Sequence, residues 1–175
     1  MDITIERAEE NHRPEIMRLL KQANMHYIPS PEMPELTYVN YFVAKADGKV
    51  VGFCGYKILG SSKAKTELMV VDKKHRGKGI GYALQVRRME DMLEKGICEL
   101  TTNSDIPATI AWYKKHFGYV EAGRLDKLHE FGEPTINHWT VLVDDRKPGL
   151  ENERKRHYSR SRGSVSYTHL RAHET

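Results

Sequence analysis

The chain has 175 residues, of which 39% are hydrophobic and 30% are charged. This length and mixture fit one globular domain with a single core, and two domains are not expected. The formal net charge is +4, and the six Lys/Arg and three Asp/Glu of residues 150–175 supply +3 of it. The body of the chain is therefore almost neutral, and no broad nucleic-acid-binding surface is predicted for it.

No stretch of the sequence approaches the roughly 18 consecutive apolar residues that a membrane helix needs. The N-terminus also lacks a basic region followed by an apolar one, so we expect a cytoplasmic protein with no membrane association. Cys54 and Cys98 each lie in an apolar run, which favours buried free thiols over a disulfide. Neither cysteine suggests metal binding, and no metal is expected.

Hydrophobic spacing predicts three strands after an initial strand and helix. In chain order these five elements centre on residues 3–5, 16–23, 41–44, 50–53 and 68–71. The dipeptide Asp47-Gly48 lies between the third and fourth elements and is favoured in tight hairpin turns. The first part of the chain should therefore contain an antiparallel hairpin.

The second part continues with a helix, a strand, a helix and two more strands, over residues 82–93, 97–102, 107–117, 119–128 and 138–143. Gly96 and Gly118 are suited to end the two helices, and Asp105 is expected to cap the second one ahead of Pro107. Together these elements predict an α/β fold. The sheet should be mixed and mostly antiparallel, with about seven strands and helices on both faces.

A glycine-rich loop separates the strand at residues 68–71 from the following helix. Gly77, Gly79 and Gly81 carry no side chains that would keep a ligand away from the backbone. The first turn of a helix has unpaired N–H groups and a partial positive charge, so it can bind a pyrophosphate. Arg76 and Lys78 add positive charge to this predicted phosphate site.

Two other phosphate-binding loops fit this sequence poorly. A Walker loop requires Gly-Lys-Ser/Thr, which is absent here, so a nucleotide triphosphatase is not expected. A dinucleotide-binding loop has the form Gly-x-Gly-x-x-Gly after a first parallel strand, whereas this loop is Gly-x-Gly-x-Gly after a hairpin. A turn without a ligand is the remaining structural alternative.

The run from Val70 to Leu84 resembles the acetyl-CoA signature of GNAT N-acetyltransferases, Gln/Arg-x-x-Gly-x-Gly/Ala, with Arg76 in first place. The segment from Ala111 to Tyr119 resembles the family's second landmark, a helix ending in Tyr-x-x-x-Gly-Phe. The resemblance covers residues 1–145 in element order. It implies the GNAT fold and an acetyl-CoA-dependent N-acetyltransferase.

The resemblance also implies where the cofactor would lie. In the family, the strand before the loop splays from its neighbour and pairs with the pantetheine arm, the loop amides hold the pyrophosphate, and nearby lysines such as Lys73 or Lys74 reach the adenosine 3′-phosphate. The family often has Asn seven residues before the tyrosine, where this chain has Ile106, so Asn103 is the substitute. The implied cofactor-binding residues are Met69, Val70, Val71, Arg76, Gly77, Lys78, Gly79, Ile80, Gly81, Tyr82, Asn103 and Lys115.

The family usually works by direct attack of an amine on the thioester, which needs a base and an acid. Tyr113 matches the position of the acid, although it could equally be a core ring with a satisfied hydroxyl group. Glu67 is the candidate base, acting directly or through water, and its structural alternative is a solvent-facing strand residue. Four histidines are further candidates for the base, and each could instead be a surface or packing residue: His75, His116, His129 and His138.

The acceptor is expected to be a small-molecule amine or an amino acid, in preference to a protein lysine or N-terminus. In the family, acceptor choice comes from segments that correspond here to residues 26–32 and 128–133. Acidic residues near them can attract a cationic amine or simply be solvated: Glu32, Glu35, Glu130 and Glu133. A non-catalytic acyl-CoA sensor, transfer of a longer acyl group and a homodimer all stay open.

The domain is predicted to span residues 1–148, followed by a basic tail at 149–164. Basic residues at 154–162 suggest an RNA-binding arm, but they lack the interleaved aromatic side chains that stack on bases, so a solvated disordered tail is preferred. Residues 165–175 resemble the translation of a sequencing-library adapter and are set aside as non-native. No regular element is predicted beyond residue 159.

Overall fold

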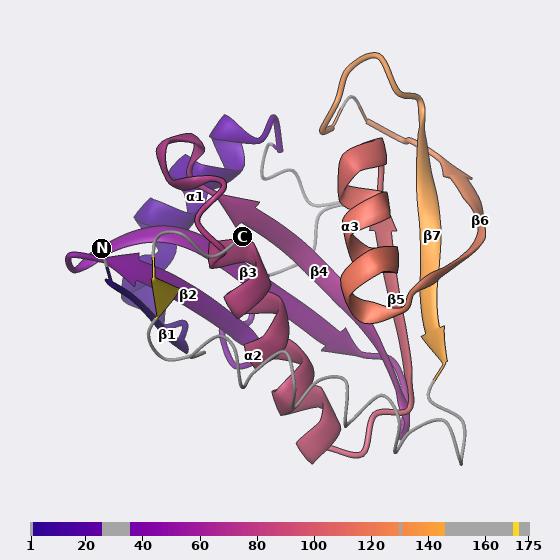
Figure 1. Ribbon diagram of the computed structural model, residues 1–175, viewed down its shortest axis with the longest axis horizontal. Helices are drawn as coiled ribbons and strands as arrows, with labels where there is room; N and C mark the ends of the chain where they lie inside the picture. Colours follow the sequence, from indigo (N-terminus) through magenta and orange to yellow (C-terminus); the bar gives the residue numbers. More distant parts are fainter. Residues whose placement is uncertain (1, 26–35, 130, 146–169, 172–175) are drawn as a thin grey trace.

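The computed structural model describes residues 2–25, 36–129, 131–145 and 170–171. Across these residues the chain forms one sheet of order β6-β7-β5-β4-β3-β2-β1-β8 and three α-helices (Figure 1). Neighbouring strands are antiparallel except β4 and β5. The elements are β1 (Asp2–Arg7), α1 (Arg13–Gln22), β2 (Tyr41–Ala46), β3 (Lys49–Ile58), β4 (Lys63–Val71), α2 (Ile80–Glu94), β5 (Glu99–Ser104), α3 (Pro107–Phe117), β6 (Val120–Asp126), β7 (His138–Asp145) and β8 (Leu170–Arg171). The predicted mixed α/β fold is confirmed.

The β2–β3 hairpin turns at the predicted dipeptide. Asp47 and Gly48 both have positive φ, 51° and 77°, as the two central residues of a tight hairpin turn require. Asp tolerates this conformation better than most residues, and Gly adopts it without a steric penalty. The local sequence is therefore sufficient to specify this turn.

Side chains of β2 alternate between two cores, one on each face of the sheet. Tyr41 and Val43 belong to the core that α1 covers, whereas Phe42 and Ala44 belong to the core that α2 covers. All four are fully buried, as expected for a strand with a helix on each face. Figure 1 shows α2 and α3 on one side of the sheet and α1 on the other, which confirms the prediction of helices on both faces.

The parallel strands β4 and β5 pair only where they begin. Residues 63–65 pair with residues 99–101, and β4 then continues to Val71 without a partner on that side. Its other edge stays paired with β3, with one extra residue, Leu68, in a bulge at φ 54°. Along residues 67–71, the backbone groups that point away from β3 therefore have no strand partner on the β5 side.

The prediction that Asp105 caps α3 is wrong. The residue at the N-cap position is Ile106, and no side chain caps this helix. The Asp105 carboxylate instead accepts hydrogen bonds from the Lys127 ammonium at 3.0 Å and from the Glu133 backbone N–H at 2.7 Å. The physical reason is that a charge pair in a buried position outweighs one capping bond.

Both cysteines are free thiols, as predicted, but only Cys54 is buried, and Cys98 is partly exposed. Burial raises the pKa of the Cys54 thiol to about 11.

No described helix has the length and apolar character needed to cross a membrane. Within the described ranges, no three His, Cys, Asp or Glu residues come together as metal ligands would.

Leu170 and Arg171 form a two-residue strand, β8, that pairs with Asp2 and Ile3 of β1. The absence of any element beyond residue 159 was expected, and this pair is the exception. Backbone pairing at an open strand edge needs no side-chain pattern, so periodicity could not predict it. The basic run at 154–162 and the predicted acceptor segment at 26–32 lie outside the described residues.

Candidate active site

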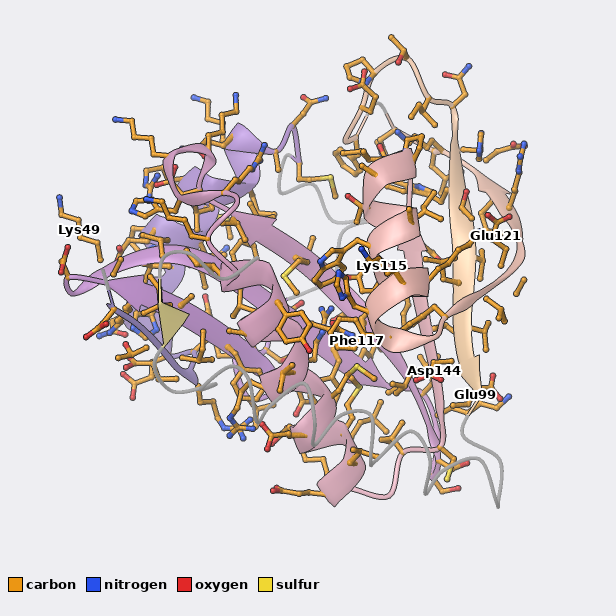
Figure 2. The ribbon with its side chains drawn as sticks, viewed as in Figure 1. Lys49, Glu99, Lys115, Phe117, Glu121 and Asp144 are labelled. Carbon is orange, nitrogen blue, oxygen red and sulfur yellow. The ribbon has the colours of Figure 1, made fainter. Side chains whose placement is uncertain are left out.

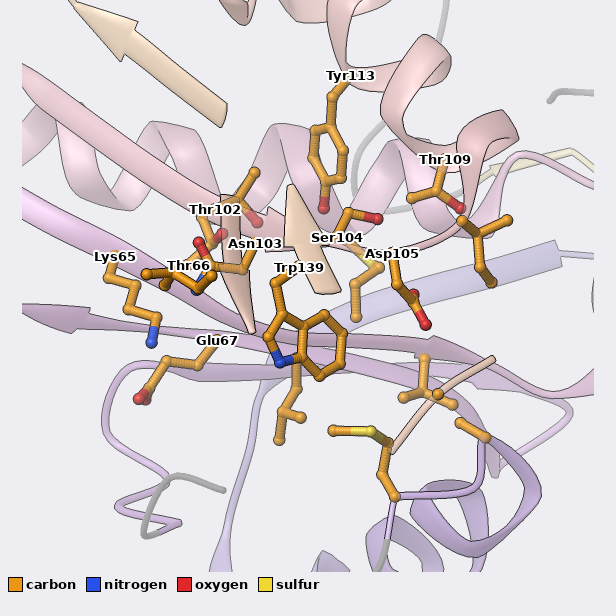
Figure 3. A pocket seen from close by; sticks show the side chains of 18 of the residues that line it. Lys65, Thr66, Glu67, Thr102, Asn103, Ser104, Asp105, Thr109, Tyr113 and Trp139 are labelled. Carbon is orange, nitrogen blue, oxygen red and sulfur yellow. The ribbon is translucent and has the colours of Figure 1, made fainter. Parts of the chain in front are cut away.

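A pocket of about 500 Å³ opens between the splayed strands β4 and β5. Its walls come from β4, β5, α3, β6, β7, the residues that follow α1 and the β6–β7 connection (Figure 3). The predicted site residues that line it are Glu67, Met69, Val70, Asn103 and Tyr113. Residues far apart in the sequence thus meet where the sheet opens.

Tyr113 reaches the pocket from α3. Its side chain is buried, and in Figure 3 its hydroxyl group points towards the middle of the pocket. The hydroxyl oxygen accepts a hydrogen bond of 3.2 Å from Nη2 of Arg88. An oxygen that already accepts a bond keeps its own proton free to donate, so Tyr113 is oriented as a donor towards the pocket.

Glu67 lies on β4, half-buried at the edge of the pocket beside Lys65 (Figure 3). Its carboxylate accepts a 3.1 Å hydrogen bond from the hydroxyl of the fully buried Tyr41. Burial raises the pKa of Glu67 above 4.5, and the Tyr41 hydrogen bond and the charges of Lys65 and Lys57 oppose this increase only in part. A carboxylate with a raised pKa is suited to accept a proton near neutral pH.

None of the four alternative histidines is among the described residues that line the pocket. Nδ1 of His75 lies 3.5 Å from Oδ2 of Asp72, near the glycine loop. His116 packs against Tyr82, and His129 stacks on Phe131. These positions favour packing or surface roles for His75, His116 and His129.

The glycine loop lies beyond the far end of β4. Gly77 and Gly79 have positive φ of 76° and 79°, and Gly79 is the N-cap of α2, with no side chain capping the first turn. A Cβ at Gly81 would contact only Val71, at 3.8 Å, so packing does not require glycine there. The amides of this first turn are therefore open to a ligand.

Some loop residues predicted to bind the cofactor have buried or engaged side chains. Ile80 and Tyr82 are buried in the core beneath α2, which leaves their backbone N–H groups as the parts available to a ligand. Nε of Arg76 donates to the Val71 carbonyl at 3.2 Å, which ties the loop to the end of β4. Lys115 lies in the last turn of α3, outside the pocket lining (Figure 2).

A buried ammonium group that sequence patterns did not reveal lies behind one wall of the pocket, in contact with the lining residues Asp105 and Trp139. Lys127 donates to the Asp105 carboxylate and to the Phe131 and Glu133 carbonyls, and lies 4.7 Å from the centre of the Trp139 ring. These contacts hold the β6–β7 connection against β7 and against the junction between β5 and α3. Lysine in a polar stretch ordinarily indicates a solvated side chain, so no local signal predicts this network.

A second wall joins segments more than 100 residues apart. The side-chain amide of Asn24 donates to the Gly132 carbonyl at 3.1 Å, and the Gly132 N–H donates to the Asn24 carbonyl at 3.3 Å. Ala23, Met25 and Gly132 all line the pocket. The end of α1 therefore forms a continuous wall with the β6–β7 connection.

Residues 8–119 match the model of the acetyltransferase (GNAT) family. The chain belongs to this family. The splayed parallel strands and the open glycine loop are the features that the resemblance implied for a GNAT fold. A search of curated proteins finds no match to this sequence.

Solved structures also resemble this GNAT chain. Ard1 from Thermoplasma volcanium aligns with a TM-score of 0.68 at 19% identity, covering 83% of this chain and 98% of that one. The ribosomal-protein-S18-alanine N-acetyltransferase of Escherichia coli aligns with a TM-score of 0.65 at 19% identity, covering 87% and 98%. The putative acetyltransferase yncA of Salmonella typhimurium, solved with its cofactor acetyl-CoA, aligns at 0.65 and 16%, covering 83% and 94%. At these identities the likeness establishes the fold.

Proposed function

We propose that residues 1–148 form an acetyl-CoA-dependent N-acetyltransferase whose acceptor is the primary amine of a small molecule. The observation that carries this proposal is the pocket between β4 and β5, where Tyr113 and Glu67 lie beside an unpaired strand edge. Membership of the GNAT family and the acetyl-CoA named with the Salmonella neighbour support the choice of donor.

The described residues fit acetyl-CoA in two places, the pocket itself and the glycine loop beyond the far end of β4. The open edge of β4 at Met69 and Val70 offers backbone hydrogen bonds to an extended amide-containing chain. The uncapped first turn of α2 offers N–H groups to a pyrophosphate. The family resemblance implies Lys73, Lys74 or Lys115 as the basic side chain that binds a further phosphate.

When bound, acetyl-CoA supplies an activated acetyl group as a thioester. Glu67 takes one proton from the acceptor's ammonium group, directly or through a water molecule, and frees its nitrogen lone pair. The nitrogen bonds to the acetyl carbonyl carbon and sheds a second proton, while the carbon–sulfur bond breaks and Tyr113 gives its proton to sulfur. The second amine proton passes to solvent, Tyr113 takes a proton back from solvent and Glu67 releases its own, which leaves the amide, the free CoA thiol and one proton released overall.

The acceptor end of the pocket favours a small molecule. The hydrogen bonds between Asn24 and Gly132 join two segments that line it, and a wall held together in this way supports a compact acceptor over an extended peptide. A protein N-terminus is the second candidate acceptor, because the Escherichia coli neighbour is named for an alanine of a ribosomal protein. A non-catalytic acyl-CoA sensor is the alternative function.

The test is a thiol-release assay with acetyl-CoA and a panel of primary amines, amino acids and peptides. We expect amine-dependent CoA release, highest with a small amine, that falls at least about a hundred-fold in Tyr113→Phe. Tyr56→Phe is the matched control, because its buried hydroxyl bonds to Asp91 away from the pocket and activity should persist. Acetyl-CoA binding without turnover on any acceptor would favour the sensor, and turnover of peptides alone would favour the protein N-terminus.

A further inference from the structure

Arg88 is a fully buried charged side chain that contacts Tyr113 of the pocket. It lies on α2, its residue is 0% exposed, and it is among the largest fully buried side chains of the described chain. Burying a charge costs several kcal/mol, so an arginine in this position is rarely retained for packing alone. Its role in the proposed reaction can be inferred from its contacts.

The guanidinium group uses all five of its N–H donors. Nη1 donates to the carbonyls of Gly55 and Leu68, each at 3.0 Å. Nε donates to Oε1 of Gln85 at 3.0 Å, and Nη2 donates to the same oxygen and to the Tyr113 hydroxyl at 3.2 Å. These acceptors are all neutral, and no carboxylate of the described residues forms an ion pair with Arg88.

Two of these acceptors belong to opposite sides of the splayed sheet. Leu68 is the bulged residue of β4, directly before the strand edge at Met69 and Val70. Tyr113 is carried by α3, which packs on β7 beyond β5. Strands β4 and β5 pair only at residues 63–65 and 99–101. Backbone hydrogen bonds therefore do not connect the two strands where the pocket lies.

We propose that Arg88 is a positioning residue that sets the separation between the Tyr113 hydroxyl and the β4 strand edge. This inference rests on the proposed function. By donating to the hydroxyl oxygen, Arg88 directs the tyrosine proton into the pocket, and its uncompensated positive charge stabilises the negative charge that develops on this oxygen as the proton leaves. Its bonds to Leu68 and Gly55 place that proton relative to the backbone amides of β4.

A double-mutant cycle tests whether Arg88 acts through Tyr113. Arg88→Lys keeps a cation but cannot make the forked contacts. We expect kcat to fall about ten-fold in the wild-type background and less than about two-fold in the Tyr113→Phe background, since the partner is then absent. Calorimetry should show a Kd for acetyl-CoA within about three-fold of wild type, because the phosphate-binding turn is untouched.

Arg87→Lys is the matched control, because this neighbouring arginine lies over the Phe42 ring and outside the network, and its kcat should match wild type. Equal losses for Arg88→Lys in both backgrounds would overturn the positioning role. Wild-type protein that binds acetyl-CoA but turns over no acceptor would instead overturn the proposed function.

If Arg88→Lys does not fold, Gln85→Glu replaces it in the same cycle. This change preserves shape but places a carboxylate against Arg88, which neutralises its charge beside Tyr113. The expected pattern is the same, a fall in kcat that disappears in the Tyr113→Phe background. Unchanged kcat in Gln85→Glu, or equal falls in both backgrounds, would reject the proposal.

Discussion

The hydroxyl of Tyr41 donates a 3.1 Å hydrogen bond to Glu67 from the core beneath the sheet. The Tyr41 ring fills the space beside Gly55, where an added Cβ would lie only 2.4 Å from a ring carbon. The tyrosine is therefore held in place, and its hydroxyl meets the carboxylate in a fixed position. Because the bond goes to the ionised carboxylate, it favours loss of the Glu67 proton.

Tyr41→Phe should therefore move the pH dependence of the reaction. Removing the hydrogen bond leaves burial as the main influence, and the pKa of Glu67 rises further. We expect the acidic limb of the kcat/KM profile to shift to higher pH, with little change on the alkaline side. A shift to lower pH, or none, would contradict the role of Glu67 as the titrating base.

Glu67→Gln should lower kcat/KM by about a hundred-fold or more, because an amide cannot accept the proton of the ammonium group. At neutral pH the same substitution should increase the stability of the folded protein. Since the pKa of Glu67 is raised in the folded protein, the stabilisation by the bound proton is fully present below about 4.5 and is lost as pH rises through the raised value.

The melting temperature of Glu67→Gln relative to wild type should therefore increase from pH 4 to pH 8. Gln still accepts the Tyr41 hydrogen bond, so the comparison isolates the charge. Thermal denaturation at matched ionic strength measures it. A difference that decreases over this pH range would show that Glu67 is stabilised as a carboxylate and is unsuited to the role of base.

Gly81→Ala should separate ligand binding from stability. Its Cβ would meet only Val71 at an ordinary distance, and alanine favours a helix over glycine by up to about 1 kcal/mol, so stability should stay equal or rise. The methyl group would lie at the open first turn of α2, so we expect acetyl-CoA to bind about ten-fold more weakly by calorimetry.

Gly96→Ala is the matched control for that experiment. Gly96 ends α2 with φ 75°, so alanine there should cost about 1 kcal/mol in stability while leaving the Kd for acetyl-CoA unchanged. If Gly81→Ala leaves the Kd unchanged as well, the turn before α2 is not the phosphate site.

Lys127→Met should be strongly destabilising. Lys127 and Asp105 form a salt bridge with side chains only 5% and 9% exposed, and removing one partner of such a pair costs about 3–5 kcal/mol. Lys114→Met is the control, because the Lys114–Glu121 pair is about half exposed and should contribute less than about 1 kcal/mol. Urea denaturation compares the two, and similar losses would show that the buried pair has no special weight.

Much of the fold could be predicted from the sequence because it depends on local signals. Turn residues Asp47 and Gly48, the helical spacing of residues 82–93 and the helix-ending Gly118 each act over a few positions. The glycine loop and Tyr113 could be recognised by the same kind of short pattern. Such elements need no information about distant parts of the chain.

The remaining features depend on partners that are distant in sequence. Asp105 carries a strong capping signal, but Lys127 lies 22 positions away and takes its carboxylate. Arg88 shares the buried face of its helix with Leu84 and Met92, so helical spacing places it inward. Arginine side chains are mostly solvated, so its charge gives no signal of burial, and only the folded arrangement of Gly55, Leu68 and Tyr113 explains it.

The short pairing between β4 and β5 has a consequence for how the molecule opens. Above residue 65 the backbone ladder of β1–β4 does not continue into that of β5–β7, so the sheet consists of two ladders joined at one end. Cooperative opening follows continuous hydrogen-bonded units, and amide hydrogen exchange reports each unit separately. The two halves can therefore exchange with different protection, and a ligand that bridges the splayed strands would merge them into one unit.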